Sequence, residues 1–274
     1  MLSNQTLEQL STLRLTAMAG EYRRQQETPV MDALDFDTRF GMITDAEWLS
    51  RNNQQTKRLV KEAGLRISAA CFKDLDYRPS RKLNQAYVAR LSDFAWVREA
   101  KNLIITGPTG TGKSYLACAY GGEACHQRIR VKYFRTNILL AELCAAYGEG
   151  RLTKSLINLN KADILILDDW GLSNMNALQG RVLLEVFESR INEKSCILAA
   201  QLPVSKWHDL FEDSSIADAV LDRLVYSSYR FELQGPSLRR QYGVVTVDHS
   251  IPADTVDFQE GLTNVETLSL PEIS

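Results

Sequence analysis

The stretch Gly107-Pro-Thr-Gly-Thr-Gly-Lys-Ser114 spells G-x-x-x-x-G-K-S and decides the fold. The apolar run Asn102-Leu-Ile-Ile-Thr106 precedes it, and a helix-favouring run starts at Tyr115. Strand, glycine loop and helix in this order form a phosphate site. Glycines let backbone N–H groups approach an anion, and the positive end of the new helix attracts the same charge. The alternative is a glycine-rich turn that only links a strand to a helix, which needs neither the lysine nor the hydroxyl.

The chemistry of this loop assigns a role to its last two residues. Lys113 is predicted to reach the β- and γ-phosphates of a nucleotide, and the Ser114 hydroxyl to take one Mg²⁺ position. The residues predicted to bind ATP here are Gly107, Pro108, Thr109, Gly110, Thr111, Gly112, Lys113, Ser114 and Tyr115.

A second motif lies about 55 residues downstream, where Ala162-Asp-Ile-Leu-Ile-Leu-Asp-Asp169 is an apolar run that ends in two carboxylates. Such a strand belongs in the middle of a parallel sheet, and ligands bind at the carboxyl ends of its strands. Asp168 is predicted to hold Mg²⁺, and Asp169 to orient or deprotonate the attacking water. A strand ending in a polar turn is the alternative. Together the two motifs predict a nucleotide triphosphatase core that uses ATP and Mg²⁺.

Size and composition are those of an ordinary globular protein. The chain has 274 residues, a 45% hydrophobic fraction and a formal net charge of −2, which suits one large domain or a large and a small one. No apolar run approaches the roughly 20 residues that cross a bilayer, and the amino terminus does not resemble a secretory signal. Five cysteines without C-x-x-C spacing favour a reducing cytoplasm. We therefore expect no membrane partner.

Residues 1–80 are predicted to form a helical domain that binds DNA or a partner. Leucines from Leu7 onward recur at helical spacing, with Gly20 as a stop, and a capping box at Thr44 starts a helix that ends before Gly64. Between Arg51 and Arg90 there are ten Lys or Arg against three acids. This is typical of nucleic-acid binding, although a solvated face balanced elsewhere is an equal alternative. The candidate DNA contacts are Arg51, Lys57, Arg58, Lys61 and Arg66.

From residue 81 the pattern changes to that of an α/β domain. Residues 81–101 are predicted to form a bridging helix, with Trp96 in the core. Five strands are predicted at 102–106, 130–134, 163–168, 195–200 and 229–233, separated by helices. The result is a parallel sheet with helices on both faces. A two-glycine excursion after the second of these strands carries Arg151 and Lys154, two further candidate DNA contacts.

Beyond the fourth predicted strand the chain adds polar groups near the expected site. Gln201 ends that strand and is predicted to lie beside Asp168, where it can hydrogen-bond the γ-phosphate or the water. An ordinary polar strand end is the alternative. Helices are predicted to begin at Val204 and at Ile216. Residues 244–274 hold six acids and no Lys or Arg, a composition typical of a disordered acidic tail.

These motifs resemble the AAA+ ATPases, and within them the IstB-type helper ATPases of insertion-sequence transposition, which are related to DnaC-type helicase loaders. The resemblance extends to about Gly243. It is carried by the glycine loop and by Leu165-Ile-Leu-Asp-Asp-Trp-Gly171, Gln201-Leu-Pro-Val-Ser-Lys-Trp207, Ile216-Ala-Asp-Ala-Val-Leu-Asp-Arg-Leu224, Gly235-Pro-Ser-Leu-Arg239 and Glu47-Trp-Leu-Ser-Arg51.

The resemblance implies further roles. Asp169 stands where most AAA+ proteins have Glu, and Gln201 is the first sensor residue, which is often Asn elsewhere. Arg223 is the arginine finger that one subunit places in its neighbour's site. Arg239 is the second sensor arginine, with Arg240 as the other candidate.

The family also implies an architecture and partners. We expect an AAA+ P-loop three-layer sandwich over residues 81–243 with a five-stranded parallel sheet and no C-terminal helical lid. The expected function is an ATPase that forms a ring or helical homo-oligomer on double-stranded DNA and recruits or regulates a transposase. The expected location is the cytoplasm, in association with the bacterial nucleoid.

Two other functions remain open at this point. A replicative helicase loader of the DnaC type shares the ATPase core but binds a helicase and single-stranded DNA. A small-molecule kinase shares the glycine loop, but it needs an acceptor site and a lid with arginines in cis. The Asp168-Asp169 pair and the late Asp-Arg-Leu sequence favour hydrolysis in an oligomer.

Overall fold

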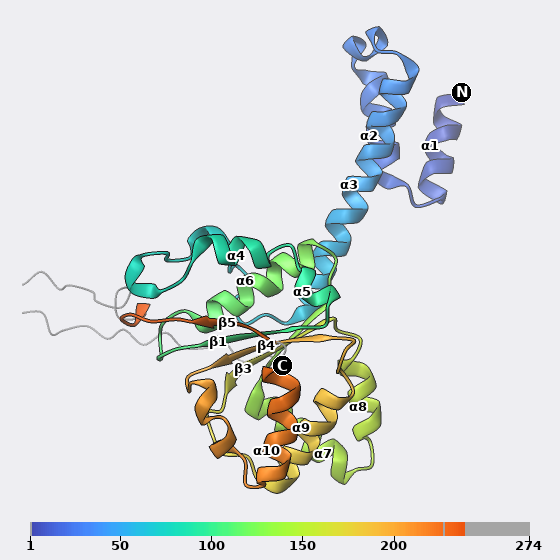
Figure 1. Cartoon of the computed structure of the whole chain (residues 1–274). Helices are drawn as coiled ribbons and strands as arrows, with labels where there is room; N and C mark the ends of the chain where they lie inside the picture. The colour runs from blue at the N-terminus through green and yellow to red at the C-terminus, as the bar shows by residue number, and fades with distance from the viewer. Residues whose placement is uncertain (1, 227, 239–274) are drawn as a thin grey trace, which may run out of the picture.

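The core of the structure is a five-stranded parallel sheet with strand order β2-β3-β4-β1-β5. The computed structural model describes residues 2–226 and 228–238, and the sheet is its central layer (Figure 1). The strands are β1 (Asn102–Thr106), β2 (Val131–Arg135), β3 (Ile164–Trp170), β4 (Ser195–Ala200) and β5 (Ser228–Glu232). The parallel sheet confirms the prediction from strand–helix alternation.

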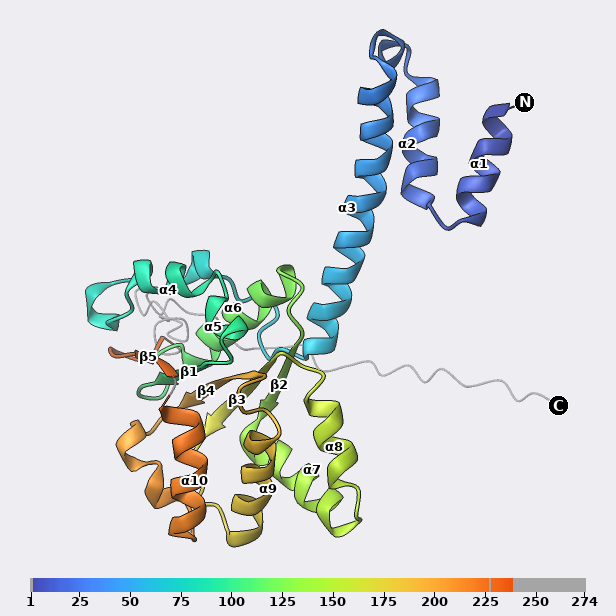
Figure 2. The same ribbon diagram turned by 45° about the vertical axis from the view of Figure 1, so that its right-hand side comes forward.

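Helices cover both faces of this sheet (Figure 2). The end of α3 lies with α4, α5 and α6 on one face, and α7 to α10 lie on the other. The α-helices are α1 (Leu2–Thr12), α2 (Thr16–Glu27), α3 (Phe36–Ala63), α4 (Gln85–Leu91), α5 (Ala95–Arg98), α6 (Lys113–His126), α7 (Thr136–Gly148), α8 (Leu152–Leu159), α9 (Ala177–Glu188) and α10 (Ser214–Val225). Short 3-10 turns occupy Pro29–Ala33, Phe72–Asp74, Pro79–Arg81, Val204–Lys206 and His208–Leu210.

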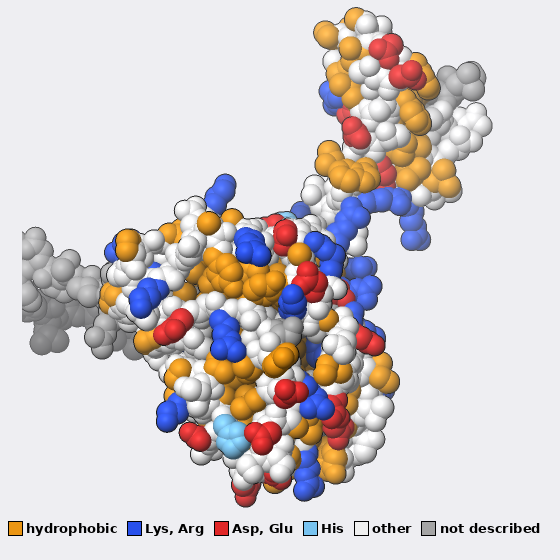
Figure 3. All heavy atoms as spheres, viewed as in Figure 1, with side chains coloured by type: hydrophobic (Ala, Val, Ile, Leu, Met, Phe, Trp, Pro, Cys, Tyr) orange, Lys and Arg blue, Asp and Glu red, His pale blue; other side chains and the backbone are white. Residues whose placement is uncertain are grey.

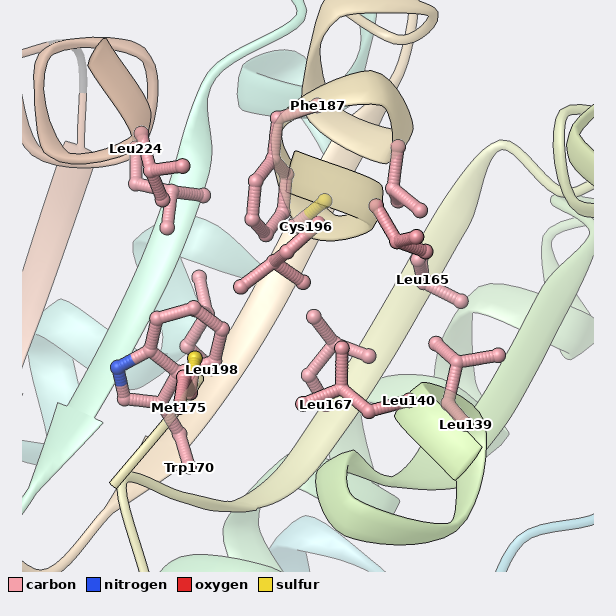
Figure 4. Close-up of a cluster of buried hydrophobic side chains, with 14 of the residues drawn as sticks. Leu139, Leu140, Leu165, Leu167, Trp170, Met175, Phe187, Cys196, Leu198 and Leu224 are labelled. Atoms are coloured by element: carbon pink, nitrogen blue, oxygen red, sulfur yellow. The ribbon is translucent and has the colours of Figure 1, made fainter. Parts of the chain in front are cut away.

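Two hydrophobic cores, one on each side of the sheet, follow from strands that are apolar throughout. All five residues of β1 and all six of β4 are buried, so alternate side chains enter opposite layers. Leu103 and Ile105 join the core beneath α4 and α6, where Trp96 is buried as predicted. Figure 4 shows the other core, in which Leu165, Leu167 and Leu198 face the helices α7, α9 and α10. This burial fixes the strand ends, and with them the functional site.

The first three helices project away from the sheet (Figure 1). α3 is 28 residues long, and its last turns enter the core on one face of the sheet through Leu59 and Ala63. Farther up α3, Glu47 is buried and accepts hydrogen bonds from the N–H groups of Ala17 and Met18, at 3.0 and 3.2 Å. These N–H groups belong to the first turn of α2, where a helix leaves its donors unpaired. One carboxylate therefore caps α2 and ties it to α3.

The helix boundaries in this N-terminal part differ from the prediction at two places. The break falls near Arg14, which has a φ of 59°, and Gly20 lies inside α2. Thr44 does not cap a helix, because α3 already starts at Phe36, where the side chain of the N-cap residue Asp35 accepts the N–H of Thr38 at 2.8 Å. The Thr44 hydroxyl instead donates to the carbonyls of the preceding turn. The predicted end of this helix at Gly64, with a φ of 63°, is confirmed.

Smaller differences occur in the α/β part. The predicted bridging helix over 81–101 is divided into α4 and α5, and the chain turns at Phe94 with a φ of 54°. The predicted helix at Val204 is a pair of 3-10 turns. β2 and β5 are each displaced by one residue, and β3 continues to Trp170. None of these differences changes the order of the strands.

Several predictions fall outside the described residues. Arg239, Arg240, the tail 244–274 and the domain limit at 243 lie there, and the division at residue 80 stays a prediction. Over residues 2–226 and 228–238, no helix has both the length and the apolar character that crossing a membrane requires.

Candidate functional site

The glycine loop leaves the carboxyl end of β1 and enters α6 at Lys113. Two of its glycines are required by close contacts. A Cβ on Gly107 would lie 2.3 Å from the carbonyl oxygen of Leu233, and a Cβ on Gly110, which has a φ of 81°, would lie 2.0 Å from Ser237 Oγ. The N–H of Leu238 also donates to the Gly110 carbonyl at 2.9 Å. The segment after β5 therefore lies directly on the loop and supports it.

The two carboxylates of β3 meet this loop at the edge of the sheet. The Ser114 hydroxyl donates to Asp168 Oδ1 at 2.9 Å, and the Tyr133 hydroxyl donates to Asp168 Oδ2 at 2.6 Å. Asp169 has a φ of 57°, and its Oδ2 accepts from Nε of Arg135 at 3.0 Å. Burial and the hydrogen bond to Asp168 raise the pKa of Tyr133, so its hydroxyl stays a donor. Asp168 is thus fixed, while Asp169 is turned toward the cavity.

A cavity of about 1000 Å³ lies over the loop. Its polar lining includes residues 109–115, Asp169 and Gln201 together with charged side chains from other segments, and its apolar lining includes Leu75, Leu83 and Leu238. A volume at the upper end of the range for ligand sites, with a lining that combines charged and apolar residues, suits a nucleotide.

The oxygen atoms at the loop fit Mg²⁺. The Ser114 hydroxyl and the Asp168 carboxylate are already adjacent, and Mg²⁺ is held by one or two protein oxygens together with substrate phosphates. The donor set is therefore that of a nucleotide-bound magnesium ion.

Other predicted site residues occupy positions around this cavity. Lys113 Nζ donates to the Pro108 carbonyl at 2.8 Å, within the loop itself. Gln201 lines the cavity, but its Oε1 accepts from the Thr109 hydroxyl at 2.8 Å instead of contacting Asp168. Tyr115 lines the cavity and accepts the N–H of Cys71 at 3.2 Å. Gln201 thus connects β4 to the loop.

Arg223 lies at the opposite end of the sheet from the loop. Asn102, the first residue of β1, donates to the carbonyls of Arg223 and Leu224 at 3.2 Å. The Arg223 guanidinium donates to Glu188 Oε1 at 2.9 Å and to the Ala219 carbonyl at 2.6 Å. The loop follows the last residue of β1, and five residues at ~3.3 Å each separate the two ends by roughly 15 Å. Arg223 therefore does not reach the loop of its own chain.

Residues 8–244 match the family described as IstB-like ATP binding protein. The chain belongs to this family. An ATP-binding protein named for insertion sequence IS1162 of Pseudomonas fluorescens is 42% identical over 205 residues, which are 75% of this chain and 89% of that protein. An insertion-sequence ATP-binding protein of Sinorhizobium fredii is 39% identical over 240 residues, 88% of this chain and 98% of that protein. The predicted resemblance is thereby confirmed.

Among solved structures, that of the DnaC helicase loader has a TM-score of 0.51 and 22% identity, and the match covers 61% of this chain and 97% of that one. At this identity the likeness shows a shared fold. It confirms the predicted AAA+ P-loop architecture, with the five-stranded parallel sheet described above.

The cations predicted to contact DNA in this IstB-like protein are found in three places. Lys57, Arg58 and Lys61 are exposed on α3, where Lys and Arg side chains gather between the projecting helices and the ATPase fold (Figure 3). Arg51, higher on α3, is held by Glu47 at 2.7 Å. On the loop before α8, Arg151 pairs with Glu149, and Lys154 is exposed on α8.

Arg66 differs from the other cations, because it lines the nucleotide cavity. Its Nη1 lies 3.8 Å from Asp168 Oδ2 and 4.0 Å from Asp169 Oδ2. Arg66 was predicted to contact DNA together with the cations of α3, because it follows that helix by only three residues. The structure instead brings it to the carboxylate pair.

Two further residues of the site lie on β2 and were not predicted. Tyr133 and Arg135 contact the carboxylate pair because β2 pairs with β3 in parallel, with Arg135 opposite Asp168. The predicted strand at 130–134 placed both residues near the carboxyl end of a strand, and this position could have indicated that they belong to the site. Their contact with Asp168 and Asp169 depends on which strands are neighbours, and that was not predicted.

Proposed function

We propose that this IstB-like protein binds and hydrolyses ATP with Mg²⁺ at subunit interfaces, assembles on double-stranded DNA, and recruits or regulates a transposase. The observation that carries the proposal is the contact between Ser114 and Asp168 beside the glycine loop, while Arg223 lies at the far end of the same sheet. A complete phosphate site and a distant arginine suggest a catalytic centre shared by two chains.

We assign hydrolysis to groups around the glycine loop. The N–H groups of the loop and the helix start of α6 bind the phosphates, and Lys113 adds its charge. Ser114 and Asp168 would hold Mg²⁺, which neutralises developing phosphate charge when bound. Asp169, oriented by Arg135, aligns the attacking water and accepts its proton.

We assign to the neighbouring subunit the arginine whose positive charge stabilises the transferred phosphoryl group. An arginine delivered in trans stabilises charge on the transferred phosphoryl group and contributes about 10³–10⁵ in rate in GTPases. The side chain of Arg223 is only 25% exposed and is paired with Glu188. We propose that this pair opens at the interface and that Arg223 enters the adjacent cavity. ATP then favours assembly, because its binding completes the interface.

DNA binding is assigned to the exposed cations of α3. Lys57, Arg58 and Lys61 are exposed charged side chains on one helix, which suits contacts to phosphates and not to sequence. Affinity should therefore fall steeply with salt. The association with a transposase rests on the relatives that are named for insertion sequences.

One experiment tests the whole proposal. Purified protein is incubated with duplex DNA and a slowly hydrolysed ATP analogue with Mg²⁺, and particle size is measured. The ATPase rate is measured in parallel with ATP and Mg²⁺ over a range of protein concentrations. The proposal expects nucleotide-dependent growth on DNA and an ATPase rate that rises more than linearly with protein concentration. A monomer that hydrolyses ATP at a concentration-independent specific rate contradicts it. Preference for single strands over duplex would favour the helicase-loader alternative.

A further inference from the structure

Arg66 lines the nucleotide cavity only three residues after the end of α3, the helix that carries the proposed DNA contacts. α3 ends at Ala63, Gly64 adopts the left-handed conformation with a φ of 63°, and the chain then reaches Arg66. Its guanidinium lies 3.8 Å from Asp168 Oδ2 and 4.0 Å from Asp169 Oδ2. Arg66, which follows the last residue of α3 by three positions, therefore faces Asp168 and Asp169.

The path between helix and cavity is anchored by packing. Ala63 is 1% exposed and packs in the core with α6. Leu65 occupies a space that exists because residue 121 is glycine, since a Cβ there would lie 2.8 Å from Leu65 Cδ2. Tightly packed interiors transmit displacements instead of absorbing them. A shift of the end of α3 would therefore move Arg66 relative to the carboxylates.

At the cavity, Arg66 is part of the polar group around Asp168. Burial opposes its charge, but the interaction with Tyr133 and the attraction of Asp168 and Asp169 outweigh it, so the pKa of Arg66 is raised. Tyr133 donates to the same Asp168 oxygen that Arg66 approaches. Asp168 is also the carboxylate that would hold Mg²⁺. Arg66 and Mg²⁺ would therefore compete for the Asp168 carboxylate. We expect a magnesium-bound nucleotide in the cavity to change the position or the partner of Arg66.

The other end of the connection carries the proposed DNA contacts. Lys57 and Lys61 are exposed on the last two turns of α3, within the part of the helix that packs on the ATPase fold through Leu59. Farther up α3, Asn52 Oδ1 accepts a hydrogen bond from Arg128, which lies two residues beyond the end of α6. Duplex bound along these cations would pull on the same turns that position Arg66.

We propose that Arg66 is a positioning residue that couples duplex binding on α3 to nucleotide binding at the Asp168-Asp169 pair. The inference rests on the proposed function. Coupling between two sites is reciprocal: a nucleotide that changes the contacts of Arg66 changes DNA affinity, and DNA changes nucleotide affinity by the same factor. Arg135 pairs with Asp169 as well, but it is the last residue of β2 and does not belong to the segment that follows α3, which makes it the matched control for loss of a cation beside the carboxylates.

The test measures two dissociation constants for each variant. A fluorescent duplex is titrated by anisotropy without nucleotide and with a slowly hydrolysed ATP analogue plus Mg²⁺, in wild type, Arg66→Ala and Arg135→Ala. We expect the analogue to tighten wild-type DNA binding by about tenfold, within the usual range of coupling. Arg66→Ala should reduce this factor to below about two while nucleotide-free DNA affinity stays the same, and Arg135→Ala should keep the wild-type factor.

Each other outcome has a defined meaning. If Arg66→Ala keeps the wild-type factor, the coupling role is wrong and the proposed function stands. If wild type binds duplex with equal affinity in both conditions, the coupling is again wrong. If wild type does not bind duplex at all, the proposed function itself fails.

Thermal melting, fluorescent-nucleotide affinity and analogue-dependent oligomer size are measured on the same samples. Loss of oligomer growth in Arg66→Ala would overturn the inference in favour of a role in assembly. If Arg66→Ala does not fold, Arg66→Gln and Leu65→Ala provide the same comparison, because the first removes the charge alone and the second removes the anchor without touching the cavity charge. Both are expected to lower the factor, and a wild-type factor in both overturns the proposal.

Discussion

The Ser114 hydroxyl donates a hydrogen bond of 2.9 Å to Asp168 Oδ1, across 54 positions of sequence. Tyr133 donates to the other oxygen of the same carboxylate. Asp168 is only 1% exposed, and a buried carboxylate requires such partners. The two ligands proposed for Mg²⁺ are therefore adjacent in the folded chain and need no rearrangement to meet.

Asp168→Asn and Ser114→Ala should each remove most of the effect of Mg²⁺ on ATP affinity. The amide loses the negative charge and the alanine loses the oxygen, and we expect a loss of at least about tenfold. Fluorescent-nucleotide titrations with Mg²⁺ and with EDTA measure the effect. Ser173→Ala, at an exposed position beyond β3, is the control and should keep the full difference between the two conditions. An unchanged Mg²⁺ effect in Asp168→Asn would show that the ion is held elsewhere.

Mixing two inactive variants should restore ATP hydrolysis. Lys113→Ala disables the loop but keeps Arg223, and Arg223→Ala keeps an intact loop, so a mixed interface contains one complete site. Arg223→Ala alone should lose about 10³-fold in turnover with little change in ATP affinity. The steady-state rate of the mixture, compared with each variant alone at equal total protein, is the measurement. A mixture no faster than the sum of its parts contradicts action in trans.

Gly110→Ala should weaken ATP binding, because the left-handed backbone and the contact with Ser237 leave no room for a methyl group. The loop or the segment after β5 must move, and we expect at least about a tenfold loss of affinity. Gly20→Ala is the matched control: nothing lies within 4 Å of its Cβ position, and it sits inside α2. That variant should raise the stability of α2 by about 0.5–1 kcal/mol. Equal nucleotide affinity in the two variants would contradict the assignment.

The docking of α2 on α3 should weaken in acid through Glu47. Burial opposes the charge of Glu47, yet hydrogen bonds from Arg51 and from the Met18 and Ala17 N–H groups lower its pKa below the ordinary value of 4.5. A lowered folded-state pKa means that the stabilisation is complete above pH 4.5 and is lost as the pH falls through the folded-state pKa. Glu47→Gln should cost about 1 kcal/mol near neutral pH.

Amide exchange across residues 16–27 measures this effect as a function of pH. In Glu47→Gln the acid-dependent part of the exchange should diminish, whereas Glu8→Gln, at an exposed position on α1, should behave as wild type. An acid profile that is the same in Glu47→Gln and wild type would assign the loss to another group.

Removing three cations of α3 should flatten the salt dependence of DNA binding. Each phosphate contact contributes about 0.9 to the slope of log affinity against log salt, so replacing Lys57, Arg58 and Lys61 by Ala should reduce the slope by about three. Anisotropy titrations at several salt concentrations measure it. The double variant Arg151→Ala with Lys154→Ala tests the other candidate surface. A larger change in that variant would move the DNA path from α3 to α8.

Much of the site was predictable because its determinants are local. The glycine loop, its strand and its helix are consecutive in sequence. The loop residues expected to contact the phosphates can therefore be identified from their spacing alone. The carboxylates of β3 were predictable for the same reason, since a buried parallel strand delivers its last side chains to one edge of the sheet. In the N-terminal helices local signals competed. Thr44 and Asp35 are both able to cap a helix, and the capping of α2 by Glu47 is a contact between segments.

The strand–loop–helix unit, the carboxylate pair and the family can be inferred from local sequence, because each depends on neighbouring residues. The positions of Tyr133, Arg135 and Arg66 around those carboxylates, and of Arg223 at the other end of the sheet, follow from the folded arrangement alone. These relations depend on strand order and on where α3 ends in the core. Burial of the apolar strands and helices sets both, because it selects neighbours by shape and volume and not by distance along the chain.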